Sequence, residues 1–138
     1  MVNDTISDLL TRIRNAGLAK QDTVSVINTK INLKITQILK KEGFIQDFVL
    51  VSNDLLAGEK ATKTLLITLK YIGQREKPGI TNIKRLSRPS FRVYSGYKDF
   101  PQLLNGMGVM IVTTPKGIMT DRDARSQKVG GELICSIW

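Results

Sequence analysis

The pattern of apolar residues changes along this chain, and that change most constrains its fold. Apolar residues recur every three or four positions over residues 4–18 and 29–42, which is typical of amphipathic helices. Asp4 is a plausible N-cap for the first helix, while Gly17 and Gly43 are suitable ends for the two helices. Both long helices are therefore predicted in the first half of the chain.

The remaining elements are predicted to be mostly extended. In the first half, strands are predicted at 23–26, 44–52 and 64–72, with an exposed hairpin loop at 53–63. After a Gly/Pro-containing linker at 73–79, the predicted strands are 80–86, 90–94, 109–113, 118–120 and 131–137. A short helix at 98–104 and a helical turn at 121–127 capped by Asp121 complete the second half. We therefore expect an α+β fold, with an N-terminal αβαββ subdomain (1–72) packed against a mostly β C-terminal subdomain (73–138).

Missing residue types exclude several kinds of site. The chain has no histidine, and Cys135 is its single cysteine. A Cys/His zinc site, a Ser-His-Asp or Cys-His catalytic group and an internal disulfide are all excluded. We expect no metal and no cofactor, and we interpret Cys135 as a core thiol. An acid–base enzyme using Asp121, Asp123 or Glu132 remains as a remote alternative.

Charge favours a polyanionic partner. Lys and Arg number 21 against 12 Asp and Glu, for a net charge of +9. Six basic residues lie within 75–92, against Glu76 alone, and among them we take Arg85, Arg88 and Arg92 as candidate phosphate contacts. The alternative is a solvated strand face. Neighbouring aromatic residues could stack on bases or fill the core; these are Phe91, Tyr94 and Tyr97.

Two short segments near the C-terminus are further candidates. Thr113, Thr114, Pro115, Lys116 and Gly117 lie between two predicted strands. They could form a simple turn, or offer hydroxyls and backbone groups to a ribose–phosphate edge. The segment Gly130-Gly131-Glu132 precedes the last strand, where a carboxylate beside glycines could orient that hydroxyl loop or accept a hydrogen bond from a base.

Several motifs together resemble the small-subunit ribosomal protein eight family. They run in the family's order along nearly the whole chain. These segments are residues 8–16 (DLLTRIRNA), 39–45 (LKKEGFI), 85–89 (RLSRP), 92–94 (RVY), 117–125 (GIMTDRDAR) and 130–132 (GGE). The resemblance implies a non-enzymatic structural constituent of the small ribosomal subunit. Such a protein binds the central domain of small-subunit rRNA directly and supports platform assembly and translation.

The resemblance also implies particular contacts. The family's main RNA-contact loop matches Thr113 to Gly117, and its supporting glutamate matches Glu132, next to Gly131. In the N-terminal half, RNA contacts match Lys30 and first-helix residues such as Thr5, and we add Arg12 and Arg14 from that helix's polar face. The expected partners are small-subunit rRNA and neighbouring ribosomal proteins, with no membrane and no small-molecule substrate.

The chain also departs from the family pattern. The family commonly has Ser-Thr-Ser in the contact loop, where this chain has Thr113-Thr114-Pro115. Pro115 has neither a hydroxyl nor an N–H, so a contact made there by serine is lost. The ending LICSIW (133–138) is similar to plastid members, and no transit peptide is evident. We therefore expect a chloroplast ribosome, with the bacterial cytoplasm as alternative. A general nucleoid-like nucleic-acid-binding protein is the alternative function.

Overall fold

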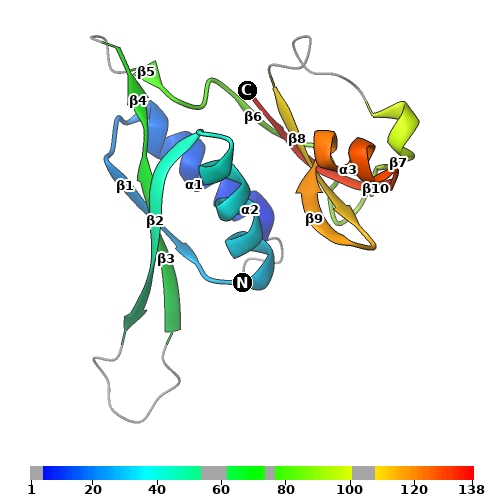
Figure 1. The fold of residues 1–138 in the computed structure, drawn as a ribbon. Helices are drawn as coiled ribbons and strands as arrows, with labels where there is room; N and C mark the ends of the chain where they lie inside the picture. The colour runs from blue at the N-terminus through cyan, green and yellow to red at the C-terminus, as the bar shows by residue number, and fades with distance from the viewer. Residues whose placement is uncertain (1–4, 54–61, 74–76, 101–107) are drawn as a thin grey trace. The chain divides into compact units, whose positions relative to one another are not determined.

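The computed structural model describes residues 5–53, 62–73, 77–100 and 108–138, and the chain forms two compact units (Figure 1). Unit 1 is Met1–Ile80 and unit 2 is Thr81–Trp138. Both units combine helix with antiparallel sheet, and unit 2 is mostly β, so the predicted α+β class is confirmed. The subdomain limits predicted at residues 72 and 73, and the packing of the subdomains, stay predictions.

Unit 1 has the predicted αβαββ order. Its elements are α1 (Thr5–Leu18), β1 (Thr23–Ile27), α2 (Lys30–Lys41), β2 (Ile45–Asn53) and β3 (Thr62–Leu69). The three strands form an antiparallel sheet in the order β1-β3-β2. Because Asn53 pairs with Thr62, the β2–β3 loop is shorter than the 53–63 predicted. Residues 54–61 of that loop and the predicted cap Asp4 lie outside the described residues.

One face of this sheet is covered by the two helices. Leu65, Ile67 and Leu69 alternate along β3 and are buried, as the period of two in a strand requires. Helix α1 packs beside β1, and α2 packs beside β2. In the described part of the chain, no helix is long and apolar enough to cross a membrane.

Helix α2 buries Ile35 and Leu39, which its apolar spacing predicts, and also two polar residues that the spacing does not indicate. Its buried residues are Asn32, Ile35, Thr36 and Leu39, whereas Ile31 is exposed. Two polar side chains are buried here, and each donates a hydrogen bond to the local backbone, although Asn32 Oδ1 has no partner among the described residues. Asn32 donates to the Ile27 carbonyl at 3.0 Å, and Thr36 donates to the Asn32 carbonyl at 2.7 Å. The polar residues thus lie on the core side, which apolar periodicity alone misassigns.

The predicted linker at 73–79 is partly a strand. Strand β4 (Tyr71–Ile72) pairs antiparallel with β5 (Lys77–Pro78). Gly73 has a positive φ of 81°, which glycine adopts without steric cost, so the chain can reverse there. Pro78 needs no ladder hydrogen bond at a sheet edge, which explains why proline did not prevent a short strand.

Unit 2 is built around its last strand. Its elements are β6 (Ile83–Arg85), β7 (Tyr94–Ser95), the 3₁₀ helix η1 (Tyr97–Asp99), β8 (Val109–Thr114), β9 (Gly117–Thr120), α3 (Asp121–Gln127) and β10 (Gly131–Ile137). The sheet order is β6-β10-β8-β9, and β7 also pairs with β10. The strand predicted at 90–94 is β7, which begins only at Tyr94. The 3₁₀ helix η1 lies near the start of the helix predicted at 98–104, and residues 101–107 lie outside the described residues.

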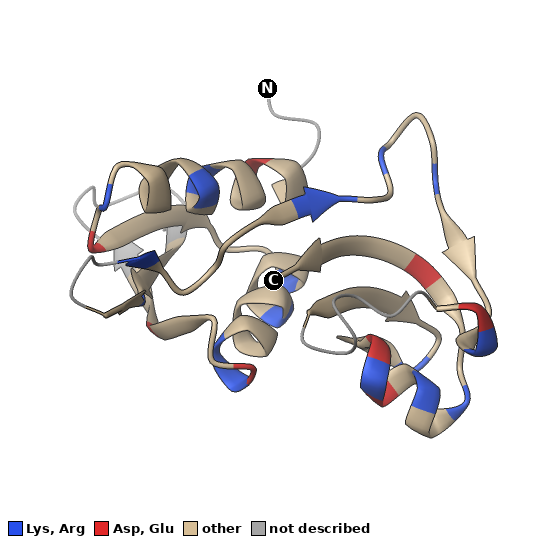
Figure 2. Cartoon of the chain, turned by 90° about the horizontal axis from the view of Figure 1, so that it is seen from above, with Lys and Arg blue, Asp and Glu red and all other residues tan. Residues whose placement is uncertain are grey.

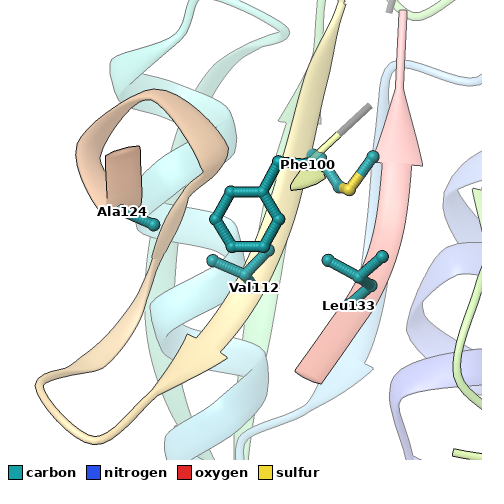
Figure 3. Packing of buried hydrophobic residues seen from close by; sticks show 5 residues of the cluster. Phe100, Val112, Ala124 and Leu133 are labelled. Carbon is teal, nitrogen blue, oxygen red and sulfur yellow. The ribbon is translucent and has the colours of Figure 1, made fainter. Parts of the chain in front are cut away.

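Helix α3 closes a hydrophobic core against this sheet (Figure 3). The buried cluster consists of Phe100, Met110, Val112, Ala124 and Leu133. The side chains come from the sheet, from α3 and from the segment after η1. This core fixes the strands that carry the candidate site.

The helix cap of α3 and the role of Asp121 differ from expectation. Thr120, not Asp121, is the N-cap, and its hydroxyl accepts from the Asp123 amide at 3.2 Å. Asp121 is buried, accepts from the Met110 amide at 3.1 Å and forms an ion pair with Arg125 at 2.8 Å. One carboxylate therefore ties α3 to β8. Asp121 thus has a structural role, which weakens its candidacy as an acid–base residue.

Cys135 is buried, as predicted for a core thiol. Its burial raises the pKa of the thiol to about 12, although the nearby Arg85 charge acts in the opposite direction. The thiol therefore stays protonated and unreactive at neutral pH.

Candidate nucleic-acid interface

The candidate loop is the tight turn of the β8–β9 hairpin. Thr114 lies opposite Gly117, and the Thr114 hydroxyl donates to the Gly117 carbonyl at 2.8 Å. The same hydroxyl accepts from the Lys116 amide at 3.2 Å. Gly117 has a φ of 116°, a backbone conformation that residues with a side chain rarely adopt. The Thr114 hydroxyl therefore builds the turn, while Thr113, Pro115 and Lys116 are exposed.

A row of polar side chains crosses the sheet beside this turn. Glu132 at the start of β10 lies opposite Thr113 of β8 on one side and opposite Tyr94 of β7 on the other. Directly opposed residues of antiparallel strands place their side chains on the same face. The hydroxyl, the carboxylate and the phenol ring therefore form one row, which we call the Thr113–Glu132–Tyr94 row.

Two glycines allow this row to form. A side chain at Gly131 would overlap the Thr113 carbonyl oxygen, so β8 and β10 can approach only if residue 131 has no Cβ. A Cβ at Gly130 would lie 2.6 Å from the Ser95 carbonyl oxygen, which prevents any residue but glycine there too. The Gly-Gly pair thus lets the strands on both sides close around Glu132.

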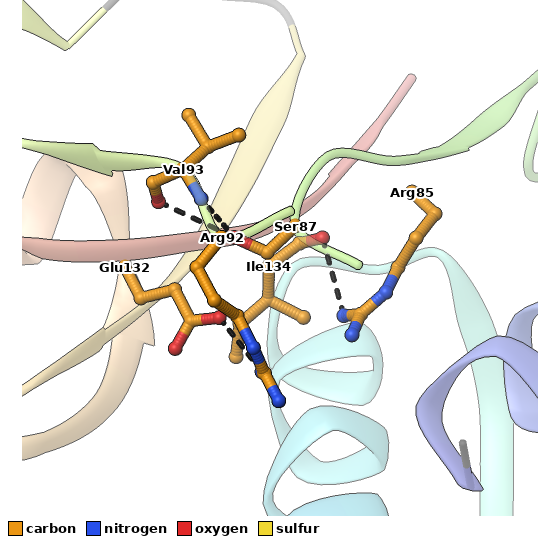
Figure 4. Close-up of polar contacts among 6 residues, drawn as sticks. All are labelled: Arg85, Ser87, Arg92, Val93, Glu132 and Ile134. Carbon is orange, nitrogen blue, oxygen red and sulfur yellow. Dashed lines mark hydrogen bonds and ion pairs between the residues drawn. The ribbon is translucent and has the colours of Figure 1, made fainter. Parts of the chain in front are cut away.

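The carboxylate of Glu132 is held by a cation (Figure 4). Arg92 Nη1 lies 3.0 Å from Glu132 Oε1, and the Glu132 side chain is only 20% exposed. Ser87 braces the segment that carries Arg92, since its hydroxyl accepts from the Val93 amide at 2.8 Å. The ion pair orients one carboxylate oxygen and offsets its charge, so the Thr113–Glu132–Tyr94 row can approach a polyanion.

Within the predicted basic stretch, residues 88–91 form a hydrogen-bonded turn next to Arg92. Arg88 and Phe91 exchange two backbone hydrogen bonds, of 2.8 and 3.0 Å. Arg88 is exposed and so is Phe91, which is 70% accessible. Arg85 is different, because it is half-buried and its Nη1 donates to the Ile134 carbonyl at 3.4 Å (Figure 4). Arg88 is therefore better placed than Arg85 to contact phosphate, whereas Arg92 is paired with Glu132.

Comparison with known proteins agrees with this geometry. The family model described as ribosomal protein S8 matches residues 4–138. The chain belongs to the ribosomal protein S8 family. It is 63% identical over 138 residues to small ribosomal subunit protein uS8c of Tupiella akineta, covering all of both chains. It is also 54% identical to uS8c of Pleurastrum terricola, over the whole of both chains.

A cyanobacterial relative shows that the similarity extends beyond the uS8c proteins. The chain is 53% identical to small ribosomal subunit protein uS8 of Gloeothece citriformis, covering 99% of this chain and 98% of that one. As an S8 family member, the chain is a structural ribosomal protein and not an enzyme. The resemblance inferred from its motifs is confirmed.

The S8-type contacts predicted in unit 1 lie at the starts and outer faces of its helices. Thr5 begins α1 and is half-buried, while Lys30 begins α2 and is exposed. Arg12 is paired with Asp8 at 3.0 Å within α1, and Arg14 is exposed. The structure does not test their RNA contacts, which stay predictions.

Tyr94 is one of three aromatic residues, with Phe91 and Tyr97, that the sequence left undecided between base stacking and the core. Its ring could have filled the core, but it is 69% exposed and lies next to Glu132. Tyr97, by contrast, packs against the hydrophobic cluster. In the sequence, only the spacing of two residues between Arg92 and Tyr94 indicates that their side chains point to the same side of a strand. The position of Tyr94 opposite Glu132 depends on strand register, which the sequence does not show. Among the described residues, no group of three or more Cys, Asp or Glu is placed to hold a metal ion.

Proposed function

We propose that this S8 family member binds the central domain of small-subunit rRNA directly and supports platform assembly. The observation that carries the proposal is the Thr113–Glu132–Tyr94 row, flanked by the exposed Arg88 and the Glu132-bound Arg92. Hydroxyl, carboxylate and aromatic groups can contact ribose 2′-OH groups, base amino groups and base faces, respectively. The surface therefore has the chemistry to recognise unpaired or distorted RNA.

Affinity and specificity are divided between different residues in this proposal. The cations contribute through counterion release, which depends on salt and not on sequence. Thr113 and Glu132 contribute directional hydrogen bonds, which depend on RNA shape. Because Arg92 already neutralises Glu132, Arg88 and Lys116 are the side chains that we assign to phosphate.

We also propose a plastid ribosome as the site of action, with small-subunit rRNA and adjacent small-subunit proteins as partners. Relatives called uS8c in Tupiella akineta, Pleurastrum terricola and Chlorokybus atmophyticus, each matched over their full length, support this assignment. Crosslinking from residues 113–117 within purified ribosomes would identify the nucleotides in contact.

Filter binding with two variants tests the division of roles. We expect Thr113→Ala to weaken binding to a central-domain transcript with little change in the dependence of affinity on salt. We expect Arg88→Ala to reduce that salt dependence by about one contact's share, roughly 0.7 to 0.9 in the log–log slope. Thr81→Ala, an exposed threonine of the same unit, is the matched control and should bind normally.

The same experiment separates this function from general nucleic-acid binding. A protein that recognises only charge would lose affinity equally for the transcript, random RNA and duplex DNA in both variants. Equal losses of that kind would contradict the proposal.

A further inference from the structure

The sheet of unit 1 has one face that no described element of this unit covers. Helices α1 and α2 lie on the other face, against the buried Leu65 and Ile67 of β3 (Figure 1). Side chains alternate along a strand, so Thr64 and Leu66 point away from both helices, and their cross-strand neighbours point the same way. This surface, which we call the open face, has two rows across the sheet: Ile27, Thr64 and Val51 in one, and Ser25, Leu66 and Val49 in the other.

The apolar residues of the open face are contiguous and accessible. Val49 is 54% exposed, Ile27 50% and Val51 39%. Single exposed apolar residues are normal on a protein surface, whereas a contiguous group that spans three strands indicates an interaction site. The serine and threonine of the two rows have short side chains that do not block an approaching surface. The open face is therefore suited to packing against another apolar surface.

Strand β2 gives this face an edge to which a further strand can be added. It is the last strand in the order β1-β3-β2, and among the described residues it pairs with β3 alone. Proteins commonly protect such edges with Lys or Pro, and β2 (Ile45–Asn53) contains neither. Leu50 is 45% exposed between Val49 and Val51, so three consecutive apolar residues are accessible along this edge. An extended peptide can add to an edge of this kind through backbone hydrogen bonds.

The open face is uncharged within a strongly basic chain. None of its residues is Lys or Arg, although the net charge of the chain is +9. The basic residues on the helices of unit 1 are blue in Figure 2. Beside β2, Lys40 is paired with Asp47 at 2.9 Å, so these two charges offset each other. Because phosphates bind through cations, the phosphate backbone of RNA has no favourable partner on this face.

Charge complementarity favours a protein as the occupant of the open face. A neighbour that binds the same rRNA needs basic residues of its own, so the basic surfaces of this chain repel it. The open face lacks this repulsion. The cores of protein–protein interfaces are also depleted of charged residues, as this face is.

We propose that the open face and the edge of β2 form a docking site for an extended aliphatic segment of one neighbouring small-subunit protein. The segment adds a strand beside β2 and places alternate side chains next to Val49 and Val51. This inference rests on the proposed function, which includes adjacent small-subunit proteins as partners, and it assigns a surface to one of them. The docking site is separate from the residues that we assign to RNA.

Crosslinking in assembled small subunits identifies the occupant. In a Ser25→Cys variant, a benzophenone is attached at residue 25 of the open face, and the labelled full-length chain is assembled into the subunit. We expect a crosslink to a peptide of one small-subunit protein. Ile72→Cys, labelled in the same way on β4, is the matched control and should not give this crosslink. The label is confined to the new cysteine because Cys135 is buried.

A second variant tests whether the apolar side chains form the contact. In the labelled Ser25→Cys chain, Val49→Thr/Val51→Thr should lower the yield of the protein crosslink several-fold. Threonine is β-branched like valine, so the strand should be retained, as circular dichroism would verify. Ile72→Thr, at another exposed apolar position of unit 1, is the matched control and should leave the yield unchanged. Equal yields with and without the two valines would overturn the proposal.

The remaining outcomes separate this inference from the proposed function. Crosslinks from residue 25 to rRNA, to a second copy of this chain or to nothing would each overturn the docking site alone. Filter binding of Val49→Thr/Val51→Thr to the central-domain transcript should match that of the unchanged chain. Failure of the unchanged chain to prefer that transcript over random RNA would instead contradict the proposed function.

Discussion

At the scale of single residues, absent side chains matter as much as those present. Gly131 has no Cβ, and only for that reason can the main chain of β10 lie against Thr113. The contact surface then consists of Thr113, Glu132 and Tyr94, with Arg92 holding the carboxylate.

A methyl group at residue 131 should break the site. We expect Gly131→Ala to lower the free energy of unfolding by about 3 kcal/mol or more, because the new Cβ would overlap the Thr113 carbonyl oxygen. Denaturant titration would measure the loss, and filter binding would show weaker RNA binding. Gly96→Ala is the matched control, since the nearest atom to its Cβ would be Asp99 Oδ2 at 3.9 Å. Equal stability of the two variants would contradict the expectation.

The buried thiol should make stability depend on alkaline pH. Because the pKa of Cys135 is raised from an ordinary 9.0 to about 12, only the unfolded chain ionises its thiol between those values. This contribution to stability is complete below pH 9 and is lost as the pH rises toward 12. At pH 10 the loss should be about 1.4 kcal/mol relative to pH 7. Cys135→Ala should lack this part of the decline, and an identical decline in both chains would refute it.

At the scale of elements, short polar links decide where helices begin and how they attach. Thr120 caps α3, and the following Asp121 joins that helix to β8. The sequence predicts the helical turn at 121–127 correctly but assigns the cap to Asp121. Thr and Asp are both common N-cap residues, so residue preference alone cannot identify the cap. Thr120 is the cap because strand β9 ends there in an extended conformation and the helix begins at the next residue.

Removing the cap should loosen α3 and the core beneath it. We expect Thr120→Ala to cost about 1 kcal/mol of unfolding free energy, since the Asp123 amide loses its acceptor. Thermal or chemical denaturation would measure the change. Ser126→Ala, at an exposed position of the same helix, should change stability by only a few tenths. A loss as large in Ser126→Ala would rule out the cap as the cause.

Long periodic elements are predictable here, and short ones are not. The helices α1 and α2 follow from their spacing of apolar residues, and the hairpin strands β2 and β3 follow from their β-branched content. Strand β5 and the limits of β7 do not follow, because two-residue strands depend on a partner that is distant in sequence. The burial of Asn32 and Thr36 on α2 does not follow either, because it depends on hydrogen bonds to the backbone.

At the scale of the whole molecule, charge is spread over both units. Residues 81–138 have 9 basic and 4 acidic residues, and residues 1–80 have 12 and 8. In the proposed function, the Thr113–Glu132–Tyr94 row of unit 2 supplies shape-dependent contacts, and exposed basic side chains supply charge alone. The free energy of RNA binding by the entire chain should therefore have one contribution that depends strongly on salt and another that depends on it less.

Competition at two salt concentrations should separate these parts. Between 50 and 200 mM salt, we expect affinity for duplex DNA to fall more than affinity for the central-domain transcript, because counterion release dominates the former. Filter binding with labelled transcript and unlabelled DNA would measure the ratio. A preference for RNA that does not grow with salt would contradict a shape-dependent contribution.

The sequence by itself determined the fold class, the family, the absence of His and Cys pairs for metal or disulfide sites, and the basic character of the chain. Each of these depends on residue identity or on short periodic patterns. Only the tertiary structure decided that Thr113, Glu132 and Tyr94 share one face of the sheet. It also decided that the Thr114 hydroxyl forms hydrogen bonds within the turn and that Arg92 forms an ion pair with Glu132. These contacts join strands separated by many residues, and strand register is set by packing that no local pattern records.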